Sequence, residues 1–104
     1  AYMPGRQSWV QYCGSTGIYT HELGHNLSLH HAATPTSEYG DGSDPMGGAR
    51  NVRNNAANQV MAGWLPTGSV VDVFAGGSYA VAALDAGTAS SAQVLRLVKP
   101  DTNE

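Results

Sequence analysis

The chain has 104 residues, of which 41% are hydrophobic and only 12% charged, and this composition fits one small folded domain or part of a larger one. Eight acidic residues against five Lys and Arg give a formal net charge of -3, and the basic residues are scattered, which argues against nucleic-acid binding. No apolar run reaches the roughly 20 residues that a membrane-spanning helix requires.

The first predicted element is a helix that follows an irregular segment. Residues 1–17 are expected to form a strand remnant and a loop, because Pro and Gly interrupt the apolar positions. The helix is predicted to begin near Ser15 or Thr16, since either side-chain oxygen can accept a hydrogen bond from an N–H of the first turn. Its apolar residues recur every four positions and form one stripe: Tyr19, Leu23 and Leu27.

A long loop and a second helix are predicted next. Residues 32–54 show no periodic pattern and are repeatedly broken by Pro and Gly, so we expect an irregular loop. A loop of this length inside a compact domain is usually functional or disordered. The second helix is predicted over residues 55–65, before Pro66, from apolar residues at helical spacing: Ala57, Val60, Met61 and Trp64.

Beyond Thr67 the spacing of apolar residues changes from about 3.6 to 2, which predicts short strands. We expect three of them, near residues 71–73, 79–83 and 95–97. Gly76-Gly77 favours a tight turn between the first two, so the segment is expected to be antiparallel.

The predicted fold class is therefore α+β, with a helical part at residues 1–66 and a β part at residues 67–104. Three strands are few for an independent domain, so we expect the β part to be a truncated C-terminal β module. The chain begins with Ala1 rather than Met, so we also expect the helical part to be a fragment.

The segment that indicates a chemical function is the H-E-x-x-H pattern at His21, Glu22 and His25. Residues four apart on a helix are separated by a rotation of about 400°, so both imidazoles project the same way, one turn apart. Two ring nitrogens can then reach one Zn²⁺. Glu22 adjoins the first of them and can take a proton from a water at the metal.

A catalytic zinc requires a third protein ligand, and His31 is the main candidate. Six residues rotate a helix by about 600°, so His31 cannot join His25 on a continuous helix. We therefore expect the helix to end near Ser28, with a sharp turn that places this residue in the left-handed region. The neighbouring His30 is the alternative third ligand, or else a residue near the site or on the surface.

These motifs resemble the metzincin metallopeptidases, and among them the gametolysin family. The resemblance covers about residues 1–65 and, more loosely, the β segment. It rests on four segments: H-E-L-G-H-N-L-S-L-H-H-A, E-Y-G-D, D-P-M-G and A-N-Q-V-M-A-G-W-L. It implies that His21, His25 and His31 bind zinc and that Glu22 is the general base. It also implies that Met46 lies in a Met-turn, as a hydrophobic floor beneath the metal rather than as a ligand.

The resemblance further implies the fold of residues 1–66 and a function. The fold would be the C-terminal part of a zincin catalytic domain: an active-site helix, an irregular Met-turn loop and a C-terminal helix. The function would be that of a secreted zinc endopeptidase acting on a protein or peptide, with extracellular-matrix or cell-wall glycoproteins as a family-level expectation. The chain departs from the family pattern at Ser28, where Gly is preferred, and it lacks a Met-turn tyrosine because Gly47-Gly48 follow Met46.

Several residues have competing interpretations. Tyr39 or Tyr19 could replace the missing tyrosine, but we interpret Tyr39 as loop packing and Tyr19 as part of the apolar stripe. The acidic loop residues Glu38, Asp41 and Asp44 could hold Ca²⁺, although solvated turn formers are the favoured interpretation. The lone Cys13 is a buried small hydrophobe, a half-cystine whose partner lies elsewhere, or a reactive thiol.

A second functional hypothesis keeps the zinc but not the catalysis. The chain would then be a zinc-stabilised binding or structural fragment, its metal closed by a fourth ligand such as Cys13 or Asp44. A third, minor hypothesis makes residues 70–98 an adhesive β module and the front half of the chain a degenerate relic. Zinc itself is an inference, because imidazole sites bind copper more tightly.

Overall fold

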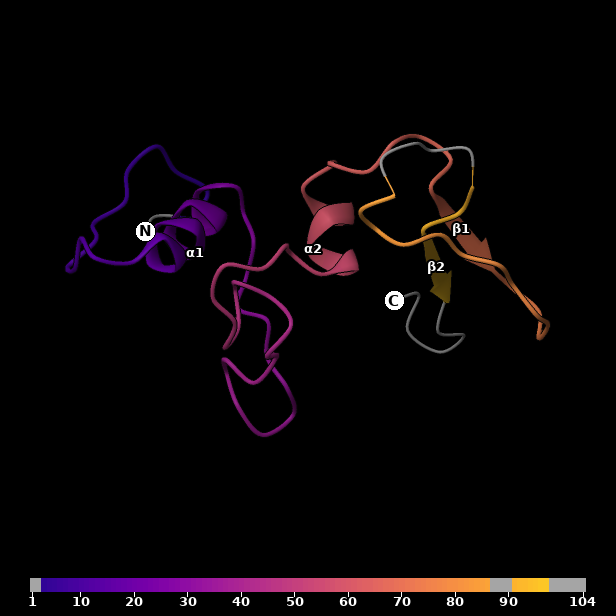
Figure 1. The fold of residues 1–104 in the computed structure, drawn as a ribbon, viewed down its shortest axis with the longest axis horizontal. Helices are drawn as coiled ribbons and strands as arrows, with labels where there is room; N and C mark the ends of the chain where they lie inside the picture. The colour runs from indigo at the N-terminus through magenta and orange to yellow at the C-terminus, as the bar shows by residue number, and fades with distance from the viewer. Residues whose placement is uncertain (1–2, 87–90, 98–104) are drawn as a thin grey trace. The chain divides into compact units, whose positions relative to one another are not determined.

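A computed structural model describes residues 3–86 and 91–97 of the chain (Figure 1). The chain divides into two compact units, Ala1–Ala62 and Gly63–Glu104. In chain order the elements are α1 (Thr16–Asn26), α2 (Ala56–Met61), β1 (Val70–Val73) and β2 (Val94–Leu97). Both helices belong to the first unit and both strands to the second. The predicted division into domains at residues 66 and 67 stays a prediction. Within the described ranges, no helix has the length and apolar character needed to cross a membrane.

Helix α1 packs through its glycines rather than through its apolar stripe. It begins after Ser15, which has extended backbone but makes no side-chain cap. Gly17 and Gly24 are its buried residues, while Leu23 is 57% and Leu27 54% exposed. Side chains from the following loop can approach the helix closely only where the helix has no Cβ. This explains why the packed face of α1 is marked by glycines.

The sharp turn expected after α1 is present at Ser28. This residue has a φ of 69°, in the left-handed region. The Ser28 N–H donates to His25 O at 2.9 Å and the Leu29 N–H donates to Gly24 O at 3.0 Å. These two bonds form a Schellman motif, which satisfies the last carbonyls of the helix. The predicted end of the helix near residue 28 is therefore confirmed, with serine in a position that usually favours glycine.

Helix α2 is shorter than predicted. Its N-cap is Asn55, whose side-chain oxygen accepts a hydrogen bond from the Asn58 N–H at 3.0 Å. The helix ends at Met61 instead of continuing to residue 65, and Gly63 follows in the left-handed region with a φ of 68°. The apolar spacing that suggested a longer helix includes Trp64. This side chain is 50% exposed, so little apolar surface would be buried by continuing the helix to it.

The β unit corrects the predicted strand arrangement. Strands β1 and β2 pair in parallel, in a register that runs from Val70 opposite Val94 to Val73 opposite Leu97. The antiparallel prediction was wrong, because some twenty residues join the two strands and return the chain to the same end of β1. Gly76-Gly77 does not close a hairpin, and residues 79–83 form no strand. Residues 87–90, between the second and third predicted strands, lie outside the described residues.

An ion pair joins the two strands at their third register position. Asp72 lies opposite Arg96, and the guanidinium binds the carboxylate through two bonds, Nε to Oδ1 at 2.6 Å and Nη2 to Oδ2 at 2.9 Å. These hydrogen bonds lower the pKa of Asp72 and raise that of Arg96. Both side chains are largely exposed, so the ion pair adds little to the stability of the fold. We infer that it helps to set the register of the two strands.

Candidate metal centre

Three histidines converge in the first unit. His21 and His25 lie one turn apart on α1, and the turn at Ser28 brings His31 back beside them. The Nε2 atom of His25 lies 3.2 Å from Nε2 of His21 and 3.1 Å from Nε2 of His31. One nitrogen from each ring falls within 4.8 Å of the others, which makes this trio a potential metal site.

The opposite nitrogen of each ring is fixed by an oxygen. Nδ1 of His21 lies 2.8 Å from Pro45 O, Nδ1 of His25 lies 2.8 Å from Leu29 O, and Nδ1 of His31 lies 2.7 Å from a Glu38 carboxylate oxygen. Carbonyl and carboxylate oxygens only accept hydrogen bonds, so each Nδ1 carries the proton. A neutral ring in that tautomer has its lone pair on Nε2.

The three Nε2 lone pairs thus face one another. Neighbouring lone pairs repel unless a cation lies among them. A tetrahedral Zn²⁺ with bonds of about 2.0–2.1 Å would separate its nitrogen ligands by about 3.3 Å, close to the 3.1 and 3.2 Å found here. Burial, with a smaller contribution from the nearby His21 and His31 rings, lowers the pKa of His25, which favours the neutral ring that a metal requires. The residues present therefore fit a zinc ion.

A tight turn at residues 44–47 supports this centre from below. Met46 is fully buried, and a Cβ added to Gly24 would lie 2.3 Å from its sulfur. The methionine therefore rests against the turn of α1 between His21 and His25. The preceding carbonyl, that of Pro45, accepts the hydrogen bond from His21. The turn thus both packs against the helix and orients one of its imidazoles.

Asp44 holds this turn in shape. Its buried carboxylate accepts hydrogen bonds from the Met46 N–H at 2.7 Å, the Asn54 side-chain amide at 3.2 Å and the Asn55 N–H. The last of these bonds joins the turn to the start of α2. These partners give Asp44 a structural role, rather than that of the fourth zinc ligand considered above.

The acidic loop does not assemble a calcium site among the described residues. Glu38 is bonded to His31, and Asp44 to the turn it supports. Asp41 accepts hydrogen bonds from Ser43 and from Asn55, which lower its pKa. Asp41 fits the favoured interpretation of a turn former. The interpretation of a solvated turn former was wrong for Asp44, which is fully buried, and Glu38 instead bonds to His31.

Two other candidates lie apart from the histidine cluster. Cys13 is exposed, so the interpretation of a buried hydrophobe was wrong. A hydrogen bond with Cys13 raises the pKa of Tyr19, so the Tyr19 hydroxyl lies next to the Cys13 thiol. His30 is exposed and is not part of the cluster.

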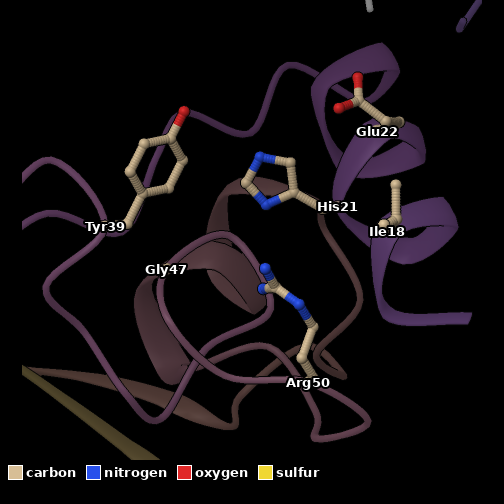
Figure 2. A pocket seen from close by; sticks show the side chains of 6 residues that line it. All are labelled: Ile18, His21, Glu22, Tyr39, Gly47 and Arg50. Atoms are coloured by element: carbon tan, nitrogen blue, oxygen red, sulfur yellow. The ribbon is translucent and has the colours of Figure 1, made fainter. Parts of the chain in front are cut away.

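From the sequence, Tyr39 is a candidate site residue for which loop packing is favoured, and Arg50 is not a candidate. The Tyr39 ring lies 4.2 Å from the His31 ring and 5.9 Å from the His21 ring, centroid to centroid, so it packs on the centre as well as on its own loop. A pocket of about 250 Å³ opens beside them (Figure 2). Its lining comprises Ile18, His21, Glu22, Tyr39, Gly47 and Arg50. Only the path of the loop brings these side chains together, and no spacing in the sequence encodes that path.

Substitution of Gly47 with Ala is expected to destroy the turn at residues 44–47. An added Cβ would lie 2.2 Å from Asp41 O and 2.9 Å from Ala32 O, and backbone atoms cannot move aside as a flexible side chain can. We expect a loss of several kcal/mol in the free energy of unfolding and no metal binding, measured by thermal unfolding and zinc titration. Gly42→Ala is the control, because a Cβ at Gly42 contacts nothing within 4 Å. Equal stability of the two variants would contradict the packing described here.

Removal of the Glu38 carboxylate is expected to weaken metal binding. Its bond to Nδ1 fixes the His31 tautomer, and loss of such a partner typically costs 10–100-fold in metal affinity. The Glu38 side chain is 68% exposed, so we expect about tenfold for Glu38→Ala in a competition titration with a chromophoric chelator. Glu38→Gln keeps an acceptor oxygen and should lose less. An unchanged affinity in the alanine variant would show that the hydrogen bond does not hold the ring.

Three histidines that could hold a metal cation therefore lie together, and Glu22 follows the first of them in the sequence. A comparison with protein-family models identifies the family: the model of the gametolysin peptidase M11 family matches residues 1–103, and the chain belongs to that family. The resemblance to the gametolysin family that the sequence indicated is confirmed. Comparisons with curated proteins and with solved structures gave no match.

Proposed function

We propose that this chain is the catalytic part of a zinc-dependent endopeptidase of the metzincin type. The observation that supports it most is the convergence of three Nε2 atoms whose rings are fixed through Nδ1. Membership in a peptidase family supplies the reaction class. His21, His25 and His31 are the proposed ligands and Met46 the proposed support beneath them.

Zinc bound here would supply Lewis-acid activation of a water and of the substrate carbonyl. The protein groups provide the proton transfers. Glu22 follows the first ligand on α1 and lines the same pocket as His21, so its carboxylate is the proposed general base. It would take a proton from the attacking water and deliver it to the leaving amine. The Tyr39 ring packs against the His31 ring at a centroid distance of 4.2 Å.

The alternative is a zinc-stabilised module without turnover. A structural zinc site normally has four protein ligands, whereas a catalytic site keeps one position open. Among the described residues, the cluster consists of three histidines, and neither Cys13 nor Asp44 joins it. This donor set favours the catalytic proposal. The proposed setting is outside the cell, with protein or peptide substrates such as extracellular-matrix or cell-wall glycoproteins.

Metal analysis combined with a cleavage assay tests the proposal. The chain should bind one zinc, and it should cleave internally quenched peptides within their sequence. A chelator should abolish cleavage, and added Zn²⁺ should restore it. Copper added in place of zinc would show which ion the site can use. Stoichiometric zinc without any cleavage would favour the structural alternative, and cleavage that resists the chelator would exclude a metal mechanism.

A further inference from the structure

The pocket beside His21 contains a positive charge that the proposed proton transfers do not use. Figure 2 shows the Arg50 guanidinium pointing into the space below the His21 ring, near Gly47. At about 250 Å³ the pocket is smaller than the roughly 300–1,000 Å³ of a typical small-molecule site. Its size suits one amino-acid side chain of a bound peptide.

The stem of Arg50 is held in place by α1. Gly17 lies under it, and a Cβ added to Gly17 would lie 2.5 Å from Arg50 Cδ and 3.2 Å from Arg50 Cβ. The Nη1 group also donates a hydrogen bond to Ala49 O at 3.0 Å. The lack of a Cβ at Gly17 lets the stem of this exposed arginine pack against the first turn of the helix. This contact and the hydrogen bond to Ala49 restrict the directions that the guanidinium can take.

The guanidinium retains binding capacity. It has five N–H donors, and one is engaged by Ala49 O. Among the described residues no carboxylate lies within ion-pair distance of Arg50. Glu22 lines the same pocket, but in Figure 2 its carboxylate and the guanidinium lie on opposite sides of His21. A planar, oriented guanidinium without a carboxylate partner is suited to bind a carboxylate through two parallel hydrogen bonds.

We propose that Arg50 makes this pocket a binding site for a carboxylate of the peptide substrate, so that cleavage is favoured beside an acidic residue. This inference depends on the proposed peptidase function and adds a substrate preference to it. The carboxylate could belong to an Asp or Glu side chain or to the C-terminus of the peptide, and the experiment below separates the two sources.

Peptide cleavage measures the preference directly. Once mass spectrometry has located the bond cut in a neutral, C-terminally amidated peptide, the residues on each side are replaced in turn by Glu, Gln and Lys. At one position, kcat/KM should be higher for Glu than for Gln by about tenfold or more, with Lys lowest. A set of neutral peptides with a free C-terminus near the cleaved bond tests the other source of the carboxylate.

Variants of Arg50 then assign the preference to this residue. Arg50→Gln should remove the advantage of Glu, and Arg50→Glu should favour Lys instead. Arg53→Gln is the matched control, because Arg53 is exposed three residues further on and does not line the pocket; it should keep the wild-type preference. Zinc stoichiometry shows that each variant is folded. A carboxylate preference that survives Arg50→Gln would overturn the inference, and so would the absence of any preference for either a Glu side chain or a free C-terminus.

Failure of the peptidase proposal can be recognised separately. If the zinc-loaded chain cuts none of the peptides, their dissociation constants are measured instead by fluorescence anisotropy. Tighter binding of the Glu peptide, lost in Arg50→Gln, would support the carboxylate site while excluding catalysis. Equal affinity for the Glu, Gln and Lys peptides, together with equal affinity for amidated and free C-termini, would overturn the site itself.

Discussion

Replacement of Glu22 with Gln is expected to abolish most peptide cleavage while leaving zinc bound. The amide has nearly the shape of the carboxylate but cannot accept a proton near neutral pH. General base catalysis typically contributes 10²–10⁴-fold, so we expect kcat/KM to fall by about that factor. The ligands themselves are unchanged, because each Nδ1 is held by an oxygen of Pro45, Leu29 or Glu38 and none by Glu22. The measurement pairs kcat/KM on a quenched peptide with the zinc content of the same sample.

The matched control is the same substitution at the other carboxylate of the centre. Glu38→Gln also removes a negative charge close to the histidines, but Glu38 contacts the far nitrogen of His31 and does not line the pocket. Under saturating zinc it should keep most of the activity. A general electrostatic effect would lower activity in both variants alike. Full activity in Glu22→Gln would remove this residue from the mechanism, and loss of zinc in that variant would give it a structural role instead.

The parts of the site that could be predicted are those controlled by local geometry. The spacing of His21 and His25 on one helix places their rings together whatever the rest of the chain does. The position of His31 then requires a left-handed residue near Ser28, and the turn lies there. These predictions needed only helical rotation and the chemistry of a metal ligand. The binding of zinc and the base role of Glu22 stay predictions.

The parts that could not be predicted depend on contacts between distant residues. Tyr39 packs on the histidine rings and Arg50 reaches the pocket because an irregular loop returns to α1, and no periodic pattern records such a path. Strand pairing is also non-local: alternating apolar residues predicted strands near β1 and β2 but not their parallel direction. The alternation at residues 79–83 produced no strand, because β propensity is realised only where a neighbouring strand offers a partner.

The two adjacent histidines at the end of the motif offer the sharpest test of the metal centre. The turn at Ser28 sends His31 towards His25, with Nε2 atoms 3.1 Å apart, and leaves His30 exposed outside the cluster. Zinc bound by four protein ligands contributes about 10–16 kcal/mol, or roughly 3 kcal/mol for each ligand. His31→Ala should therefore lower zinc affinity about 100-fold.

The control is His30→Ala, which has the same composition as His31→Ala and also lacks one imidazole. His30→Ala removes the same group one residue away and should leave zinc affinity within about twofold of the original, since surface changes away from partners have small effects. Both affinities can be measured in one competition titration, with far-UV circular dichroism to show that α1 is intact. Equal losses in the two variants would mean that metal binds to a histidine-rich helix end rather than to the assembled trio. A larger loss in His30→Ala would mean that His30 is the third ligand. The turn after α1 would then have to differ from the one described at Ser28.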